Sequence, residues 1–481
     1  MVMGSLSLKT RPKSSYKRSG MKTESRDNPP PDTSTNKQNT IGSFRRVLKN
    51  RSFLLLWLAQ LLSQLVFNAA NYGVIAIVTA ITHSTELVGV AIISFTLPAV
   101  PFSPLAGVYV DYLDKRLVLW VSNALRALAT ALIVVALLWN SHTVVPLYVL
   151  AFFISLITQF FTPAEASAIP LLVRKNDLVP ALSLFNITLT IAQALGFLVV
   201  GGLITSLFPP FQLSLGFINL QVQSYDMLFV FVAIVYIVCT ILILAMPANA
   251  LRQQNVEQKL PISLGKETWR IIGHDLKETW DYIHGDRDLI LALLQVSFVS
   301  ILLLVIGELA GPFVVNVLHL PVKDMPIIFA PAGIGLVLGG LVMPYLTQRL
   351  GKGRVIALGS VSTAIGLILI PLGRFTWSRL ALPATGELFL ISGITFFIGV
   401  ALDLINIPAQ TVMQEHAPEE ERGRVFSFQS TFYNAGSIPV LLFAGAIADI
   451  VGIETVMFLL AAAILLFRWW AARYSHNSFA S

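Results

Sequence analysis

The sequence predicts an all-α integral membrane protein with about twelve transmembrane helices in two six-helix pseudo-repeats. Three observations predict this fold class. Charged residues make up only 12% of the 481 residues, about half of the roughly 25% that is usual in soluble domains. Apolar runs of about 20 residues, the length that crosses a bilayer, recur after the first 50 residues. Motifs in the first half of the chain also return in the second half.

Polar segments divide the chain into domains. Residues 1–52 hold twelve of the 33 Lys and Arg residues and are rich in Ser, Thr, Pro and Asn. Such a segment has too few aliphatic side chains to bury and is predicted to be disordered, and its charge suits an anionic membrane surface. The predicted organisation is a disordered basic cytoplasmic tail (1–52), an N-terminal half (53–247), a cytoplasmic linker with an amphipathic helix (248–288), a C-terminal half (289–473) and a short cytoplasmic tail (474–481).

Apolar runs between polar breaks mark the predicted spans. They lie at 53–81, 87–109, 117–139, 145–168, 179–207, 226–247, 289–317, 325–347, 354–373, 386–409, 425–448 and 454–473. In the break between the sixth and seventh spans, the stretch "KETWRIIGHDLKETWDYIHGDRDL" alternates charged and apolar residues at helical spacing. This pattern is typical of an amphipathic helix on a membrane surface.

Orientation follows from the positions of Lys and Arg. With the N-terminus inside, 29 of these residues fall on the inner side and three on the outer side. The sequence therefore predicts a multi-pass protein of the plasma membrane with both termini in the cytoplasm.

The two halves share short motifs. "GVYVDYLDKR", from Gly107 to Arg116, joins the second and third spans, and "GLVMPYLTQR", from Gly340 to Arg349, joins the eighth and ninth. The register keeps glycine, tyrosine and arginine, but Pro344 stands in the position of Asp111. Pro-Ala pairs near the ends of the fourth and tenth spans give a second match.

The motif Gly-x-x-x-Asp-x-x-x-x-Arg in this position resembles the signature of the major facilitator superfamily, with Gly107, Asp111 and Arg116 as its matching residues. The span count, the long central linker and the degenerate second copy also match. Details such as "PAEASAIPLLV" resemble the bacterial macrolide and enterobactin exporters, and the Pro-Ala segment is also similar to that of the lysophospholipid transporters. The fifth span lacks the proline of the motif that antiporters of the superfamily often carry.

The resemblance implies a latch between the halves at the inner side. Asp111 would face the start of the eleventh span near Arg424, where the helix dipole favours a carboxylate. Arg116 would bind a carboxylate in the forked geometry of a guanidinium, either that of Asp111 or that of Glu165 at the end of the fourth span. The alternative is a basic inner turn without a conformational role.

An ionisable residue inside a span costs about 2.5–3.5 kcal/mol on insertion scales, and three such residues are candidates for a functional role. Arg126 is a candidate for binding an anionic or polar group, or else forms a structural pair or reaches toward the inner leaflet. Glu308, in "VIGELAGPF", is the first candidate for proton coupling or cation recognition. The alternative is that its carboxylate lies at the outer rim of the protein and faces solvent. Asp403 could bind a proton, but we favour its membership in an inner polar cluster.

The superfamily lines its central cavity with spans 1, 4, 7 and 10. The resemblance therefore makes Asn68, Asn71 and Gln159, together with Glu308, candidates for the cavity wall. The alternative for the amides is hydrogen bonding between helices, worth about 0.6 kcal/mol per contact.

The predicted function is secondary active transport by alternating access, as proton-coupled efflux of an amphiphilic small molecule such as a drug, macrolide or siderophore. A lysophospholipid flippase is the alternative, and a membrane sensor or enzyme is a remote one. The seven histidines show no metal-ligand spacing and no nucleotide-binding or catalytic motif is present, so we expect no enzyme activity, cofactor or metal. Expected partners are membrane lipids, the substrate and protons, without nucleic acid, and the protein is expected to act as a monomer in the bacterial inner membrane.

Overall fold

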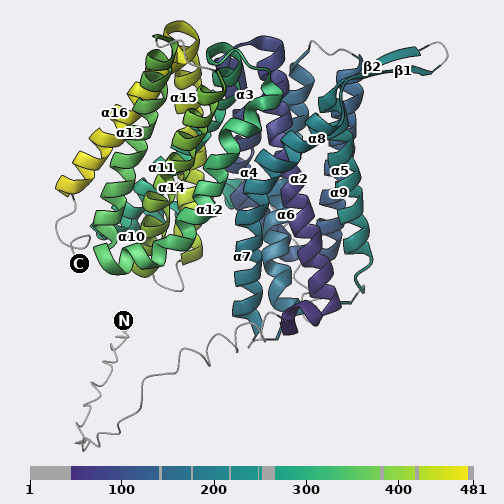
Figure 1. The fold of residues 1–481 in the computed structure, drawn as a ribbon. Helices are drawn as coiled ribbons and strands as arrows, with labels where there is room; N and C mark the ends of the chain where they lie inside the picture. The colour runs from purple at the N-terminus through teal and green to yellow at the C-terminus, as the bar shows by residue number, and fades with distance from the viewer. Residues whose placement is uncertain are drawn as a thin grey trace, which may run out of the picture. The chain divides into compact units, whose positions relative to one another are not determined.

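A computed structural model describes residues 45–139, 143–174, 177–215, 218–247, 249–251, 266–379, 384–417 and 422–474. Within these ranges, eleven helices are long and apolar enough to cross a membrane. Most of the other described residues are also helical (Figure 1), and a short hairpin is the exception in regular structure. The all-α membrane fold predicted from the sequence is therefore confirmed. The predicted disordered tail lies almost wholly outside the described residues.

The N-terminal half covers the first six predicted spans, of which the fifth is not among the eleven membrane-length helices. Its helices are α2 (Arg51–Thr82), α3 (Thr85–Thr96), α4 (Ala99–Tyr112), α5 (Lys115–Trp139), α6 (Val145–Leu172), α7 (Leu178–Ala194), the π-helix η2 (Leu195–Val200), α8 (Gly201–Leu207) and α9 (Ser224–Leu244). The second span is thus made of α3 and α4, and the fifth of α7, η2 and α8.

The C-terminal half contains the remaining six. Its helices are α11 (Arg287–Pro312), the π-helix η3 (Phe313–Val317), the 3-10 turn η4 (Val322–Asp324), α12 (Met325–Leu350), α13 (Lys352–Arg379), α14 (Ala384–His416), α15 (Arg422–Val451) and α16 (Ile453–Tyr474).

Polar side chains fix where several helices begin. A helix leaves its first N–H groups without intrahelical partners, and Asn or Asp at the preceding position accepts from them. Asn50 caps α2 by accepting from the amides of Ser52 and Phe53. Asp114 does the same for the start of α5, and Asp286 for α11. These caps end the polar loops and start the apolar spans.

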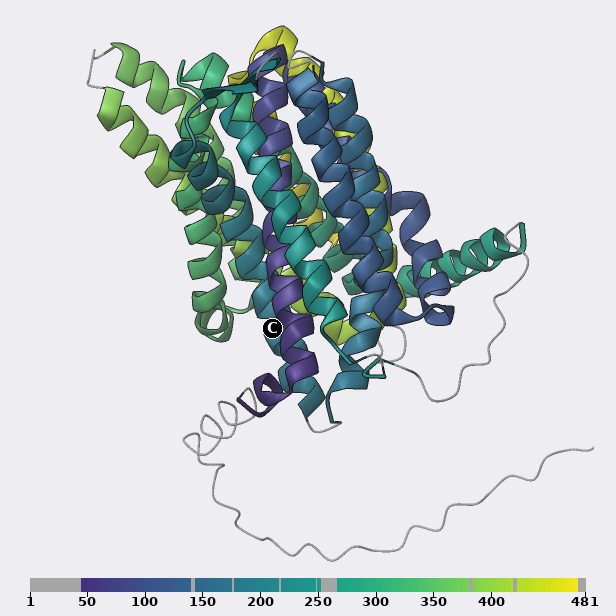
Figure 2. The ribbon, with the colours of Figure 1, turned by 90° about the vertical axis from the view of Figure 1, so that its right-hand side faces the viewer.

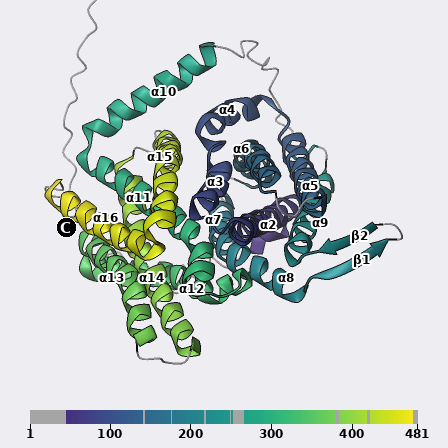
Figure 3. The ribbon, with the colours of Figure 1, turned by 90° about the horizontal axis from the view of Figure 1, so that it is seen from above.

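Two elements lie outside the spans. The linker forms α10 (Lys266–Gly285), the helix that the alternating pattern predicts. Figure 3, which looks along the spans, shows α10 lengthwise beside them, and Figure 2 shows it tilted away from their direction. An antiparallel hairpin of β1 (Phe211–Leu215) and β2 (Ile218–Val222) pairs Phe211 with Val222. The predicted spans and linker do not include this hairpin.

We call the helix ends that carry the predicted cytoplasmic loops the inner ends, and the opposite ends the outer ends. Most helix contacts stay within one half, such as α5 with α9 and α14 with α12 and α13. The halves meet where α3 packs against α11 and α15, and Figure 3 shows α3 and α15 facing each other between the two helix groups.

The buried apolar core has one large cluster that contains residues of both halves, including Val88, Phe95, Val305 and Leu441. At the inner ends the described core divides. One cluster there belongs to the N-terminal half, with Phe53 and Ile169 among its members. Separate clusters belong to the C-terminal half. The apolar packing therefore joins the halves elsewhere along their length but not at their inner ends.

Candidate functional site

Asp449 of α15 binds the start of α3 across the interface between the halves. Its carboxylate accepts from the hydroxyl of Ser84 at 2.6 Å and from the backbone amides of Thr85 and Glu86 at 2.7 and 3.1 Å. The carboxylate therefore satisfies the free N–H groups of a helix that belongs to the other half, and the helix dipole favours its negative charge. Near it, the side-chain amide of Asn316 donates to the carbonyl of His83 at 3.3 Å.

Glycines bring the outer ends of the halves into close contact. A Cβ added at any of them would overlap atoms of the opposite half, so the backbones approach more closely than any other residue would permit. These contacts are Gly445 against the backbone of Glu86, Gly311 against the side chain of Thr79, and Gly202 against the ring of Pro326. We call this set of contacts, together with Asp449 and its partners, the outer gate.

Glu308 lies in the outer gate and not at a solvent-exposed rim. Its side chain is 0% exposed. Among the described residues neither carboxylate oxygen has a hydrogen-bond partner. Glycines of both halves make room for it, because a Cβ on Gly89 of α3 or on Gly445 of α15 would overlap Oε1 of Glu308.

Arg126 is buried inside the N-terminal half. Its guanidinium is 1% exposed, donates to the hydroxyl of Ser63 at 2.8 Å and lies 4.3 Å from the ring centroid of Phe161. Arg126 follows the start of α5 by eleven residues, or about 16 Å at 1.5 Å per residue. It therefore lies well inside the span, and its role in binding a ligand remains a prediction.

Further polar groups surround Arg126. Glu165 of α6 is buried, and the two charges lie close enough to interact. Several buried atoms of this group have no hydrogen-bond partner among the described residues. They include Oε1 of Glu165, Nδ2 of Asn123 and Oε1 of Gln60, whereas the guanidinium of Arg126 lies close enough to the hydroxyl of Tyr236 to share a hydrogen bond with it. Because buried polar atoms are seldom left unpaired, this group has the capacity to bind water, a proton or a polar ligand.

The residues predicted for the inner latch are not gathered in one contact. Arg116 donates to the carbonyls of Ile243 and Leu244 at 3.5 and 2.6 Å, so it binds the end of α9 in its own half. Arg424 forms an ion pair of 3.7 Å with Glu278 of the linker helix. A Cβ on Gly107 would have no atom of the described residues within 4 Å. The side chain of Asp111 lies outside the described residues, and the latch remains a prediction.

The second copy of the loop motif lies at the end of α12. Gly340 faces Oδ2 of Asp403, which would be 3.6 Å from an added Cβ, and Gly339 contacts the same side chain. Asp403 of α14 therefore packs against the glycines that precede the loop. Arg349 is exposed and lies over the ring of Tyr345, with 4.4 Å from its guanidinium carbon to the ring centroid.

The three predicted amides are half-buried and bond along their own helices. Asn68 donates to the carbonyl of Gln64, Asn71 to that of Phe67, and Gln159 to that of Ser155. These bonds leave their side-chain oxygens as potential acceptors. Their role in a cavity wall remains a prediction.

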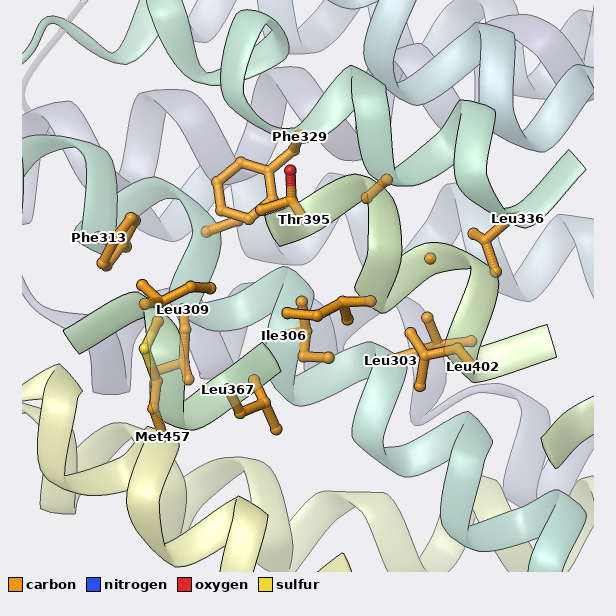
Figure 4. A pocket seen from close by; sticks show the side chains of 15 residues that line it. Leu303, Ile306, Leu309, Phe313, Phe329, Leu336, Leu367, Thr395, Leu402 and Met457 are labelled. Carbon is orange, nitrogen blue, oxygen red and sulfur yellow. The ribbon is translucent and has the colours of Figure 1, made fainter. Parts of the chain in front are cut away.

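An apolar cavity of about 70 Å³ lies inside the C-terminal half. Figure 4 shows it between side chains of α11, α12, α13 and α14, among them Leu303, Phe329 and Leu402. The hydroxyl of Thr395 is also in its wall, but it donates to the carbonyl of Ile328 at 2.8 Å. An apolar lining of this kind favours an alkyl or aryl group over water.

Asp286, Asp288 and His416 meet at the inner end of the C-terminal half, where one atom of each lies within 4.8 Å of the others. The spacing of histidines in the sequence does not indicate this group, because its residues come from the start of α11 and the end of α14, which lie far apart in the sequence. One oxygen of Asp286 already caps α11, and Nδ1 of His416 contacts the carbonyl of Val412.

Sequence reasoning missed the principal residues of the outer gate. The roles of Asp449, Gly89 and Gly445 depend on contacts with the opposite half, and no local sequence pattern indicates such contacts. The one usable signal is the order Ser84-Thr85-Glu86 before an apolar run, which is typical of a helix start that needs an acceptor. Arg126 and Glu308 were identifiable because an ionisable residue inside an apolar span requires an explanation.

Known proteins resemble this chain in sequence and in fold. The chain is 23% identical over 393 residues to an uncharacterized MFS-type transporter, YfiS, of Bacillus subtilis (strain 168), with 80% of this chain and 83% of YfiS covered.

Two solved structures resemble its fold. One is a bacterial homologue of the human lysosomal transporter Spinster, with a TM-score of 0.66 and 14% identity, covering 88% of this chain and 96% of that one. The other is a bacterial homologue of the iron transporter ferroportin, with a TM-score of 0.63 and 17% identity, covering 89% of this chain and 99% of that one. At such identities these two show the fold alone. The sequence profile of the Major Facilitator Superfamily matches residues 56–438 and 380–478, and the chain therefore belongs to the Major Facilitator Superfamily.

Proposed function

We propose that the protein exports an amphiphilic small molecule in exchange for protons by alternating access, with both termini in the cytoplasm of a bacterium. The division of the core carries this proposal. Apolar packing and hydrogen bonds join the halves at the outer gate, whereas the inner ends hold separate apolar clusters. This is the arrangement of a transporter closed on its outer side, and the opposite state would require the outer contacts to break.

The chemistry of the two halves supports an amphiphilic substrate. The N-terminal half holds the buried polar group around Arg126 and Glu165, and the C-terminal half holds the apolar cavity. A ligand with a polar group and an apolar body could use both. The resemblance of the loop and Pro-Ala segments to exporters of macrolides and enterobactin points to the same kind of molecule.

The test uses purified protein in liposomes that contain a pH-sensitive dye. A macrolide, a catechol siderophore and a lipophilic cationic dye are offered in turn under an imposed proton gradient. We expect at least one of them to move against its own gradient, with protons moving in the opposite direction, and an ionophore that collapses the gradient should stop the accumulation. Matched liposomes without protein are the control.

Other outcomes would redirect the proposal. Flipping of labelled lysophospholipid without any response to these compounds would favour the lysophospholipid transporter. Accumulation that persists after collapse of the proton gradient would contradict proton coupling. Binding of a compound without its movement would favour a sensor.

A further inference from the structure

Glu308 is unusual because its carboxyl group is enclosed by both halves of the protein at once. It projects from α11 into a notch whose walls are Gly89 of α3, in the N-terminal half, and Gly445 of α15, in the C-terminal half. A methyl group at either glycine would overlap Oε1 of Glu308. The notch therefore exists only while α3 and α15 are together, which is the closed state of the outer gate.

Among the described residues, no positively charged group is seen to face Glu308. On α15, Asp449 lies one turn beyond Gly445 and interacts electrostatically with Glu308, and on α3, Glu86 has an exposed side chain. On α2, the hydroxyl of Thr79 donates to the carbonyl of Ile75 at 2.8 Å. Within the described part of the chain, Glu308 forms neither an ion pair nor a hydrogen bond.

The two carboxylates of the gate therefore stand in opposite situations. Asp449 accepts three hydrogen bonds at a helix N-terminus, which suits the ionised form. Glu308 has no partner, and an isolated charge of this kind costs so much to bury that such groups become neutral instead. Two adjacent carboxylates also disfavour a second negative charge. The closed gate thus accommodates Glu308 as the neutral acid.

A polar hollow on the outer side would give Glu308 access to protons when the gate opens. A hollow of about 500 Å³ lies directly outside the gate and is lined by residues of both halves, among them His83, Asn316, Arg374, Asp449 and Glu454. Separation of α3 from α15 would open the notch toward this polar hollow and expose the carboxyl group of Glu308 to water.

We propose that Glu308 is a proton-binding site that controls the outer gate, and that a proton taken up from the outer side permits α3 and α15 to close over it. This inference rests on the proposed transport cycle, in which it makes the return from the outward-open state depend on a proton. Because one proton is linked to the change, the ratio of open to closed gate should rise by at most about tenfold per pH unit.

The test measures distances across the gate without any substrate. Trp139 of α5 and Phe389 of α14, which are 89% and 81% exposed, lie at the outer ends of different halves. Both are changed to cysteine and spin-labelled in a Cys239→Ala background, because Cys239 is the only cysteine of the chain. Pulsed electron–electron double resonance in lipid nanodiscs then gives the distribution of distances between the two labels from about pH 5 to about pH 9.

In the protein with Glu308 intact we expect a short distance at low pH and a growing long-distance population as the pH rises. Glu308→Gln, which keeps the shape of the neutral acid, should hold the short distance at every pH. Glu86→Gln removes an exposed carboxyl group at the same gate and should retain the pH response. A monodisperse Glu308→Gln protein that still responds to pH would overturn the proposal, and so would an intact protein whose distances ignore pH.

These outcomes are separate from the transport assay. If no compound is transported but the distances change with pH and Glu308→Gln abolishes this change, the proposed function is wrong and the proposed role of Glu308 is retained. If transport is found and the distances in Glu308→Gln still change with pH, the proposed role of Glu308 is wrong and the proposed transport function is retained.

Discussion

Asp449 carries its charge at the outer gate because three donors from the opposite half surround it. Its contribution is local and can be compared with known capping energies. Loss of an N-cap side chain costs about 0.5–2 kcal/mol, and 1–2 kcal/mol is a factor of about 5–30 in an equilibrium. One residue can therefore decide which state of the gate dominates.

Asp449→Ala should open the outer gate, since the first amides of α3 lose their acceptor. We expect the ratio of open to closed gate to rise by about two- to thirtyfold, measured with the spin-label pair at Trp139 and Phe389. Asp449→Asn keeps one acceptor oxygen and should have a smaller effect. Glu454→Gln, a nearby acidic residue outside these hydrogen bonds, is the control, and an Asp449→Ala protein with unchanged distances would show that the cap does not hold the gate.

At the residue scale, the sequence identified the charges inside spans but not their partners. Arg126 and Glu165 were predicted for different roles, a ligand contact and the inner latch, and the structure brings them into one buried group. Their common location depends on how α5 and α6 rotate against each other, which spacing within either helix does not reveal. Arg116 likewise binds carbonyls at the end of α9, and backbone acceptors leave no mark in a sequence.

The helices themselves were predictable because hydrophobic length alone defines a span. Where a span departs from a regular α-helix, the sequence was less informative. The fifth and seventh spans each contain a π-helix, Leu195–Val200 and Phe313–Val317. In the fifth, Gly196 packs against the carbonyl of Leu65 in α2, a contact between helices that no local pattern encodes. The hairpin at Phe211–Val222 alternates apolar and polar residues, and a search for period-two patterns would have found it.

Gly89→Ala should weaken the packing of α3 against α11 and α15. The added methyl group would overlap the carboxyl group of Glu308, and overpacking of this kind costs about 1–3 kcal/mol. Because the overlap exists only in the closed gate, the cost falls on that state, and the long-distance population between Trp139 and Phe389 should increase. Gly273→Ala, at a position of the linker helix with open space around it, should leave the distances unchanged. A Gly89→Ala protein with a fully closed gate would show that the notch can relax.

For the whole molecule, closure of the outer ends and separation of the inner apolar clusters are two aspects of one arrangement. Alternating access requires a second arrangement in which inner contacts replace outer ones. The loop motif offers a residue for it, since Gly107 has open space around it among the described residues. The duplicate motif has Pro344 in the place of Asp111, so an inner latch made with the carboxylate would depend on the first half alone.

Gly107→Ala should therefore act in the opposite direction to Gly89→Ala. In the present state the new methyl group meets no atom, and alanine inside a helix is favoured over glycine by about 0.5–1 kcal/mol, so thermal stability should be equal or higher. If α4 must approach α15 when the inner ends close, the methyl group obstructs that state. The outward-open population and the transport rate should then fall.

Asp111→Asn should also lower the outward-open population and the transport rate, because the inner contact loses its charge. Spin labels at Leu117 and Leu350, exposed at the inner ends of different halves, would report the change directly. Normal inner distances and normal transport in both variants would show that the halves close elsewhere.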